Sequence, residues 1–270
     1  MSIITISRGT MSGGILLAEA VGRRLDATVS CREDLIRANP LLAEMESELG
    51  GEILSRPPYM YDTLQPLRDA YLALFRAELT DLAARGPVIY HGNGGQLLLR
   101  GLPGLLRVRV AAPLGMRLDM VSSRLGFTRI QAGKYIHEKD EGRTRWTRFL
   151  YEVESLRDEL YHDLILNLET LDVEDAAAIV AGLAELAPFT WDDADRRRIR
   201  DLALAARTTA ALQVHPNTRM IEADVVAEEG RVTIAVDAEE LGPMKREIEE
   251  TARAVEGVVE VRFDEGGRER

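Results

Sequence analysis

The spacing of hydrophobic and polar residues alternates between two periods over the first two-thirds of the chain. Short runs rich in apolar and β-branched residues predict strands at 3–7, 28–31, 87–91, 105–112 and 163–167. Between them, helical spacing of apolar residues, as at Leu17, Val21 and Leu25, predicts helices, the longer ones at 67–85 and 173–186. Strands that alternate with helices favour parallel pairing. We therefore expect a three-layer α/β fold on a parallel sheet, with ligands at the carboxyl ends of its strands.

A different pattern begins near Pro188. Residues 188–201 carry a dense mixture of acidic and basic side chains. The segments that follow predict helix 195–213, strand 221–227, strand 231–236, helix 239–255 and strand 258–263. Because Glu229 and Gly230 stand between the first two of these strands, we expect a hairpin there. The sequence thus predicts domains at 1–187 and 198–265 joined by a linker at 188–197, the second domain being a small α+β module.

The composition is typical of a soluble globular protein. Hydrophobic residues make up 46% and charged residues 29% of the 270 positions, so the chain can bury a sizeable core. Neither a secretory signal nor an apolar run of bilayer length is visible in the sequence. Cys31 is the single cysteine, which permits no internal disulfide. We therefore expect a cytoplasmic protein that is not bound to a membrane.

The net charge of −11 is unevenly distributed. It argues against binding to nucleic acid, because neutralising phosphates needs a basic face. Residues 117–148, however, hold eight basic and four acidic side chains, so this segment is +4 and the remainder −15. One interpretation is a solvated helix face with ion pairs between neighbouring turns. The other is a site for a small polyanion, in which residues 139–148 form a lid that bends at Gly142 and closes its arginines over a phosphoryl group.

The stretch TISRGTMSGG, residues 5–14, has the outline of a phosphate-binding loop between a strand and a helix. In the general pattern G-x-x-x-x-G-K-[S/T] a lysine reaches the terminal phosphates. Here Gly14 stands at the lysine position and Ile15 at the hydroxyl position. The loop can still bind an anion, because a helix start presents unpaired N–H groups and Gly13 lets the backbone approach a ligand, while Arg8 can add charge. The alternative is that these glycines only allow the helix to pack closely on the strand.

Other catalytic chemistries have little support in the sequence. The four histidines are scattered, and no histidine or cysteine spacing matches a zinc site. A G-x-S-x-G nucleophile motif is absent. Asp140, Glu141 and Asp163 are candidates to hold Mg²⁺ through water molecules, but the sequence does not select among them. The glycine-rich stretch 92–95 indicates either a tight turn or a second place where the backbone can approach a ligand.

Together these motifs resemble the cytidylate kinase-like family, a branch of the P-loop nucleoside monophosphate kinases. The resemblance covers residues 1–187 in one collinear order, and the stretches that carry it are ITISRGTMSGG, CREDLI (31–36), 88–126, DEGR (140–143) and HDLILN (162–167). It implies a five-stranded P-loop sheet, bound ATP with Mg²⁺, and a nucleoside monophosphate in the cleft opposite. This branch commonly has glycine at the lysine position of the loop, as Gly14 is here.

The resemblance also implies roles for individual residues. It implies ATP contacts for the loop residues Ser7, Arg8, Ser12, Gly13, Gly14 and Ile15. The arginines implied at the transferred phosphoryl group are Arg8, Arg117 and Arg143. The residues implied for the acceptor are Arg32, Gly92, Asn93, Gly94 and Arg124. Asn93 stands where the family tends to have arginine, His162 stands where it has an aromatic residue, and loop residues 9–11 also depart from the usual pattern.

Residues 198–264 resemble a BON domain, a small α+β module associated with binding. The stretches EEGRVTIAV (228–236) and ARAVEGVVEVRF (252–263) carry this resemblance. It implies regulation, a protein partner or self-association, while the many acidic residues do not favour an anionic membrane. The whole sequence predicts an ATP-dependent kinase for a cytidylate-like acceptor. The alternatives are a non-catalytic nucleotide sensor that signals through the BON module, favoured by the missing lysine and by Asn93, and a structural protein with neither activity.

Overall fold

The computed structural model describes residues 2–55 and 58–264. Its internal contacts divide the chain into two compact units. The first, called here the sheet unit, combines Met1–Asp34 with Gly86–Trp191, and the second combines Leu35–Arg85 with Asp192–Arg270. The two units therefore interleave along the sequence, and the division into domains at residues 188–197 stays a prediction.

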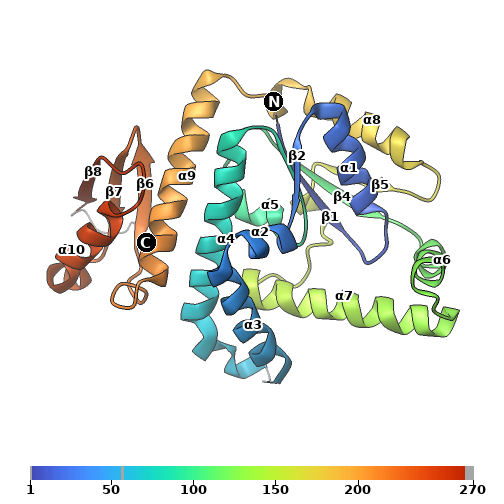
Figure 1. Ribbon diagram of the computed structural model, residues 1–270, viewed down its shortest axis with the longest axis horizontal. Helices are drawn as coiled ribbons and strands as arrows, with labels where there is room; N and C mark the ends of the chain where they lie inside the picture. Colours follow the sequence, from blue (N-terminus) through green and yellow to red (C-terminus); the bar gives the residue numbers. More distant parts are fainter. Residues whose placement is uncertain (1, 56–57, 265–270) are drawn as a thin grey trace. The chain divides into compact units, whose positions relative to one another are not determined.

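The sheet unit is built on five parallel strands (Figure 1). They are β1 (Ile3–Arg8), β2 (Thr28–Cys31), β3 (Val88–His91), β4 (Leu105–Ala111) and β5 (Leu164–Asn167), in the order β2-β3-β1-β4-β5. Every pairing is parallel, which confirms the predicted P-loop-type α/β sheet. Because β1 is central, the segments that follow β1, β3 and β4 emerge side by side at one edge.

Helices connect these strands and cover the sheet. The helices of the sheet unit are α1 (Gly14–Leu25), α5 (Gly95–Leu98), α6 (Leu114–Leu125), α7 (Arg129–Tyr151) and α8 (Val173–Ala184). It also has two single 3₁₀ turns, η2 (Glu159–Tyr161) and η3 (Ala187–Phe189). The division between the two units falls within α2 (Arg32–Ala38). α1 and α8 lie together on one face (Figure 1), where Leu17 and Val180 join the buried strand residues in one apolar core. Burial of this core is the main stabilising contribution to the unit.

The opposite face of β4 is charged. Along this strand Leu106, Val108 and Val110 are buried in the α1–α8 core. Because successive side chains of a strand point to opposite faces, Arg107 and Arg109 lie on the other side of the sheet. Their place in an interior parallel strand is unusual, since such strands normally read as continuous apolar runs. Packing alone therefore does not explain the two arginines on this face of the sheet.

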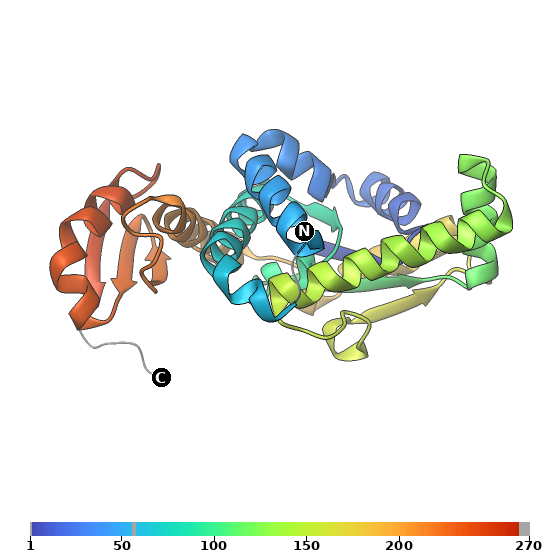
Figure 2. The same cartoon turned by 90° about the horizontal axis from the view of Figure 1, so that it is seen from below.

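The prediction of a bend at Gly142 is wrong. Residues 129–151 form one continuous helix, α7, which Figure 2 shows without interruption. Its start is fixed by a capping box, in which Thr128 and Gln131 each bond the other's backbone. A glycine inside a helix costs only about 1 kcal/mol relative to alanine, so Gly142 does not by itself interrupt the helix.

The second unit contains a helical part and a small sheet. Its helices are α3 (Pro40–Ser55), η1 (Pro58–Leu64), α4 (Gln65–Arg85), α9 (Asp193–Val214) and α10 (Ala238–Arg253), and its strands are β6 (Asp224–Glu228), β7 (Arg231–Ala235) and β8 (Glu260–Asp264). α4 and α9 pack through small side chains that include Ala77 and Ala206, and Arg207 pairs with Asp81. α9 begins inside the predicted linker, whose last residues are therefore helical.

The small sheet has the predicted order of elements. β6 and β7 pair antiparallel around Glu229 and Gly230, which both have positive φ, 50° and 84°. Two positive φ values in succession are the geometry of a tight hairpin turn. α10 then returns the chain so that β8 pairs parallel with β7. The last residue of the predicted module, 265, lies outside the described residues.

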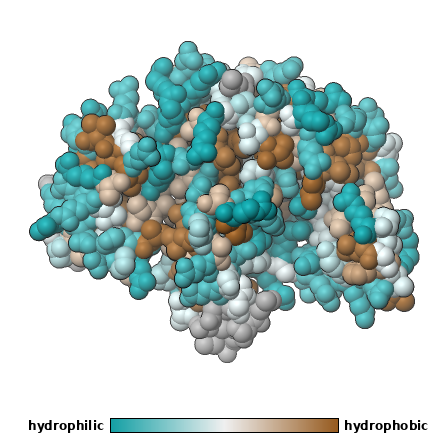
Figure 3. Space-filling view, in the orientation of Figure 1, coloured by the Kyte–Doolittle hydropathy of each residue, from teal (hydrophilic) through white to brown (hydrophobic). Residues whose placement is uncertain are grey.

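The described helices contain no membrane-spanning candidate, since none combines sufficient length with sufficient hydrophobicity. Figure 3 shows mostly hydrophilic side chains on the face it displays, with hydrophobic residues in small separate patches. Scattered patches of this size are normal on protein surfaces.

Candidate active site

The loop between β1 and α1 depends on its glycines. Gly13 has φ 88° and Met11 has φ 56°, so two residues of this short loop adopt the left-handed conformation. A Cβ atom on Gly13 would lie 2.7 Å from Cδ1 of Leu168. Both the backbone angle and the packing therefore require glycine at position 13.

Arg8 occupies the space that a side chain at position 14 would need. A Cβ atom on Gly14 would lie 2.6 Å from Cδ and 2.8 Å from Cβ of Arg8. Burial lowers the pKa of Arg8, and its Nε is buried without a hydrogen-bond partner. A buried guanidinium nitrogen with no acceptor costs free energy, which a bound anion would recover. Arg8 thus places a positive charge beside the position where the general loop has its lysine.

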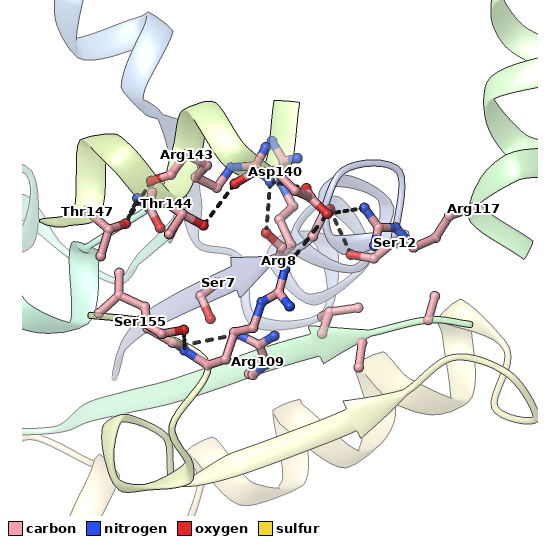
Figure 4. A pocket seen from close by; sticks show the side chains of 17 residues that line it. Ser7, Arg8, Ser12, Arg109, Arg117, Asp140, Arg143, Thr144, Thr147 and Ser155 are labelled. Atoms are coloured by element: carbon pink, nitrogen blue, oxygen red, sulfur yellow. Dashed lines mark hydrogen bonds and ion pairs between the residues drawn. The ribbon is translucent and has the colours of Figure 1, made fainter. Parts of the chain in front are cut away.

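Five arginines surround one cavity beside this loop (Figure 4). This arginine cavity has a volume of about 170 Å³. Its guanidinium groups belong to Arg8, Arg109, Arg117, Arg143 and Arg157, and Asp140 is the single carboxylate among its lining residues. The lining therefore carries a net charge of +4. Such a concentration of guanidinium groups matches the geometry and charge of phosphate.

Asp140 holds the loop and two of these arginines together. Its Oδ1 accepts from the backbone N of Thr10 at 3.1 Å and from Oγ1 of Thr10 at 2.7 Å. Arg117 donates to Oδ2 at 2.5 Å, and Arg143 donates to Oδ1 at 3.1 Å. Burial acts to raise the pKa of Asp140, but the bonds from Arg117 and Thr10 outweigh it, so the pKa lies below its usual value. The carboxylate thus fixes the arginine positions against their mutual repulsion.

Two further arginines enter from other elements. Arg109 of β4 donates to the carbonyl oxygen of Leu156 at 3.2 Å. Burial lowers the pKa of Arg109, and the positive charge of Arg157 acts in the same direction. Arg157, in the segment after α7, lies 4.0 Å from Asp140 and remains largely exposed. Neither side chain is neutralised by a carboxylate of its own in the contacts described here, which leaves charge for a ligand.

A second cavity, of about 180 Å³, lies along the loop and is called the loop cavity. Its lining shares Arg8, Ser12 and Arg143 with the arginine cavity. The remaining lining is more apolar and includes Met120 of α6 and Tyr135 of α7. Flat and apolar side chains beside a glycine-rich loop suit a nucleobase next to its phosphates.

The structure distributes the predicted site residues over these two cavities. The arginine cavity contains Ser7, Arg8, Ser12, Asn93, Arg117 and Arg143. The loop cavity contains Arg8, Ser12, Gly13, Gly14, Ile15, Arg124 and Arg143. Arg32, Gly92 and Gly94 line neither of the two. Asn93 donates to Oγ1 of Thr147 at 2.6 Å, and Arg32 lies over the ring of Trp146.

Arg109 and Arg157 were missed by the sequence reasoning. The signal for Arg109 was its place in LLRVRVA, because a charged residue in an interior parallel strand must face a site or a partner. Arg157 follows a helix in an irregular exposed segment and gave no such signal.

The described residues do not form a metal centre of their own. Among them, no group of three or more His, Cys, Asp or Glu side chains is arranged to hold a metal ion. Ile15 stands where the general loop has a hydroxyl for Mg²⁺. Both oxygens of Asp140 already accept from arginine.

Comparisons with known proteins identify a family and a fold. Residues 3–170 match the model of the cytidylate kinase-like family. No curated protein matches the chain. An uncharacterized protein from Eubacterium ventriosum ATCC 27560 has a similar structure, with a TM-score of 0.53 at 16% identity over 68% of this chain and 98% of that one. A gluconokinase from Sinorhizobium meliloti 1021 is similar with a TM-score of 0.43 at 19% identity, over 68% of this chain and 94% of that chain. At these identities a structural likeness shows the fold alone.

Proposed function

The chain belongs to the cytidylate kinase-like family, and from this premise we propose that it is a kinase that transfers the γ-phosphoryl group of ATP to a cytidylate-like nucleoside monophosphate. ATP would occupy the loop cavity as its magnesium complex. The acceptor would place its phosphate in the arginine cavity. Catalysis would consist mainly of positioning the two phosphates and stabilising the charge between them.

The observation that carries this proposal is the shared wall of the two cavities. Arg8, Ser12 and Arg143 line both of them. A phosphoryl group that passes from one cavity to the other would therefore meet the guanidinium groups of Arg8 and Arg143. Arginines placed at a transferring phosphoryl group are worth roughly 10³-fold or more in turnover.

A nucleotide sensor without catalysis is the second candidate. Asn93 stands where the family tends to have a phosphate-binding arginine, and its amide bonds Thr147 of α7. Asp140 already engages Arg117 and Arg143. In this alternative, nucleotide binding would rearrange α7, and the BON-like module at 198–265 would pass the change to a partner. As a kinase, the protein would use the same module for regulation or docking.

Calorimetry and a coupled assay on the full chain separate these candidates. We expect ATP to bind, and ADP to be released when a panel of nucleoside monophosphates is offered with magnesium–ATP. Arg143→Met should lower this turnover roughly 10³-fold, because it removes the charge shared by both cavities. Arg129→Met, at the exposed start of the same helix, is the matched control and should retain it. ATP binding without turnover for any acceptor would favour the sensor, and a chain that binds no nucleotide would refute both.

A further inference from the structure

Ser7, the residue before the last one of β1, has its hydroxyl directed at a histidine. Oγ of Ser7 lies 2.8 Å from Nε2 of His162, and the two residues are only 4% and 9% exposed. Ser7 also lines the arginine cavity. A serine that contacts both a histidine and a polyanion site has the two partners that a nucleophile requires.

The backbone around His162 determines which of its nitrogens is free to accept a proton. Nδ1 of His162 lies 3.1 Å from the carbonyl oxygen of Asp158. Because a carbonyl can only accept, Nδ1 carries the hydrogen, and Nε2 of the neutral ring accepts from the Ser7 hydroxyl. Burial lowers the pKa of His162, and the positive charges of Arg109 and Arg107 lower it further. The hydrogen bond to Asp158 acts to raise it, but the pKa remains below its usual value. The lowered pKa favours the neutral ring, in which Nε2 carries no proton and accepts from Ser7.

A short turn holds this ring in position. His162 follows η2, whose first turn is capped because Oδ1 of Asp158 accepts from the backbone N of Leu160 at 2.9 Å. The backbone N of His162 donates to the carbonyl oxygen of Glu159 at 3.0 Å. The histidine is thus oriented by its own turn, in the way that a third group orients the base of a nucleophile–base pair.

Other hydroxyl groups of the arginine cavity are bonded differently. Oγ of Ser12 donates to the carbonyl oxygen of Gly9 at 3.0 Å. The hydroxyls of Thr144 and Thr147 donate to the carbonyl oxygens one helical turn earlier, at 3.0 and 2.9 Å. A carbonyl does not remove a proton at neutral pH, whereas an imidazole does. Among these four hydroxyls, Ser7 alone is paired with a base.

The surroundings of Ser7 suit a phosphate ester. Ser7 and Arg109 are register partners on neighbouring parallel strands, so their side chains lie next to each other on one face of the sheet. Figure 4 shows Ser7 between Arg109 on one side and the α7 residues Arg143 and Thr144 on the other. Arg8 follows Ser7 directly and lines the same cavity. Three guanidinium groups are thus available to balance the charge of a phosphorylated serine.

We propose that Ser7 is a phosphoryl acceptor, with His162 as its general base. The Oγ atom attacks the γ-phosphorus of ATP, its proton passes to Nε2 of His162, and the bond from the γ-phosphorus to the bridging oxygen breaks. The products are phosphoserine at position 7 and ADP. This inference rests on the proposed function only in requiring that ATP binds beside the loop.

The test needs no acceptor. The full chain is incubated with magnesium–ATP, and the peptide that contains Ser7 is analysed by mass spectrometry. We expect one acid-stable phosphoryl group on Ser7. His162→Phe, which restores an aromatic residue and removes the base, should slow its appearance at least 10²-fold. Ser123→Ala, on the exposed surface of α6, is the matched serine control and should leave it unchanged.

Calorimetry on the same preparations separates the two ideas. A chain that binds ATP but carries no phosphate on Ser7, or carries it on another residue, would overturn this inference and leave the kinase proposal standing. A chain that binds no ATP would overturn both. Because the wild-type chain alone decides these outcomes, a variant that fails to fold does not prevent the test.

Discussion

The loop cavity and the arginine cavity meet at the same three residues but are assembled in different ways. The loop cavity takes most of its lining from one continuous stretch, residues 8–16, and the rest from α6 and α7. The arginine cavity collects side chains from β1, β4, α6, α7 and the segment after α7. The first is therefore a property of local backbone geometry, whereas the second exists only when distant parts of the chain are folded together.

Their linings also differ in kind. Apolar side chains of the loop cavity include Met11, Met120 and the ring of Tyr135. The apolar residues that line the arginine cavity are Val110, Ala111, Ala112 and Leu156, and apart from Gly9 its other lining residues are polar or charged. This difference supports a base-bearing donor in the loop cavity and the phosphate of an acceptor in the arginine cavity. The predictions below separate the two, beginning with a residue that they share.

Replacing the shared Arg8 should have the largest effect. Arg8→Met keeps an aliphatic stem that packs against Gly14 but removes the charge. We expect turnover to fall roughly 10³-fold and ATP binding to weaken, because Arg8 contributes its guanidinium group to both cavities. Steady-state kinetics and calorimetry measure the two effects. Arg23→Met, on the exposed surface of α1, is the control. If Arg8→Met left both turnover and ATP binding unchanged, Arg8 would have no role in the mechanism.

Replacing Arg109 and Arg124 should distinguish the cavities. Arg109 lines only the arginine cavity and Arg124 only the loop cavity. A hydrogen bond to a charged group is worth about 1.5–3 kcal/mol, or roughly 10–100-fold in affinity. Arg109→Gln should therefore raise the KM for the acceptor. The family resemblance implies Arg124 for the acceptor, but Arg124 lines the loop cavity, so Arg124→Gln should raise the KM for ATP. If both variants changed the same KM, the assignment of one substrate to each cavity would be wrong.

The contrast between the cavities also explains what the sequence could predict. The β1–α1 loop, the five strands and the C-terminal hairpin follow from local spacing and turn residues, and the structure confirms these elements. The sequence did not show why position 14 is glycine. The reason is that the side chain of Arg8 folds back over this position and leaves no room for a Cβ atom. Arg157 reaches the site through its contact with Asp140. The hydrogen bond between Ser7 and His162 joins residues that are far apart in the chain. No periodicity records such contacts, since they depend on how the segments around α7 and before β5 fold back toward the end of β1.

Substituting Gly13 should test whether the loop cavity depends on its backbone. Gly13→Ala forces a Cβ into left-handed backbone and toward Leu168, so we expect the free energy of unfolding to fall by about 1–2 kcal/mol and ATP binding to weaken. Chemical denaturation and calorimetry measure both. Gly182→Ala is the opposite control, because a Cβ atom added to this glycine of α8 would meet nothing within 4 Å. There we expect a gain of about 0.5–1 kcal/mol. Equal effects at both positions would contradict a special role for the loop geometry.

The smallest expected effect is on the pH dependence of stability. It comes from His162, which contacts Ser7 at the wall of the arginine cavity. The pKa of His162 is lowered in the folded chain, chiefly by burial and then by Arg109 and Arg107, while the bond to Asp158 and the charge of Asp163 oppose this. Below about pH 6.5, the ordinary histidine value, the unfolded chain therefore binds a proton that the folded chain does not. The free energy of unfolding should fall as the pH decreases through this range. His162→Gln should flatten that fall in denaturation experiments between pH 5.5 and about 7.5. An unchanged slope in His162→Gln would show that His162 is protonated equally easily in both states.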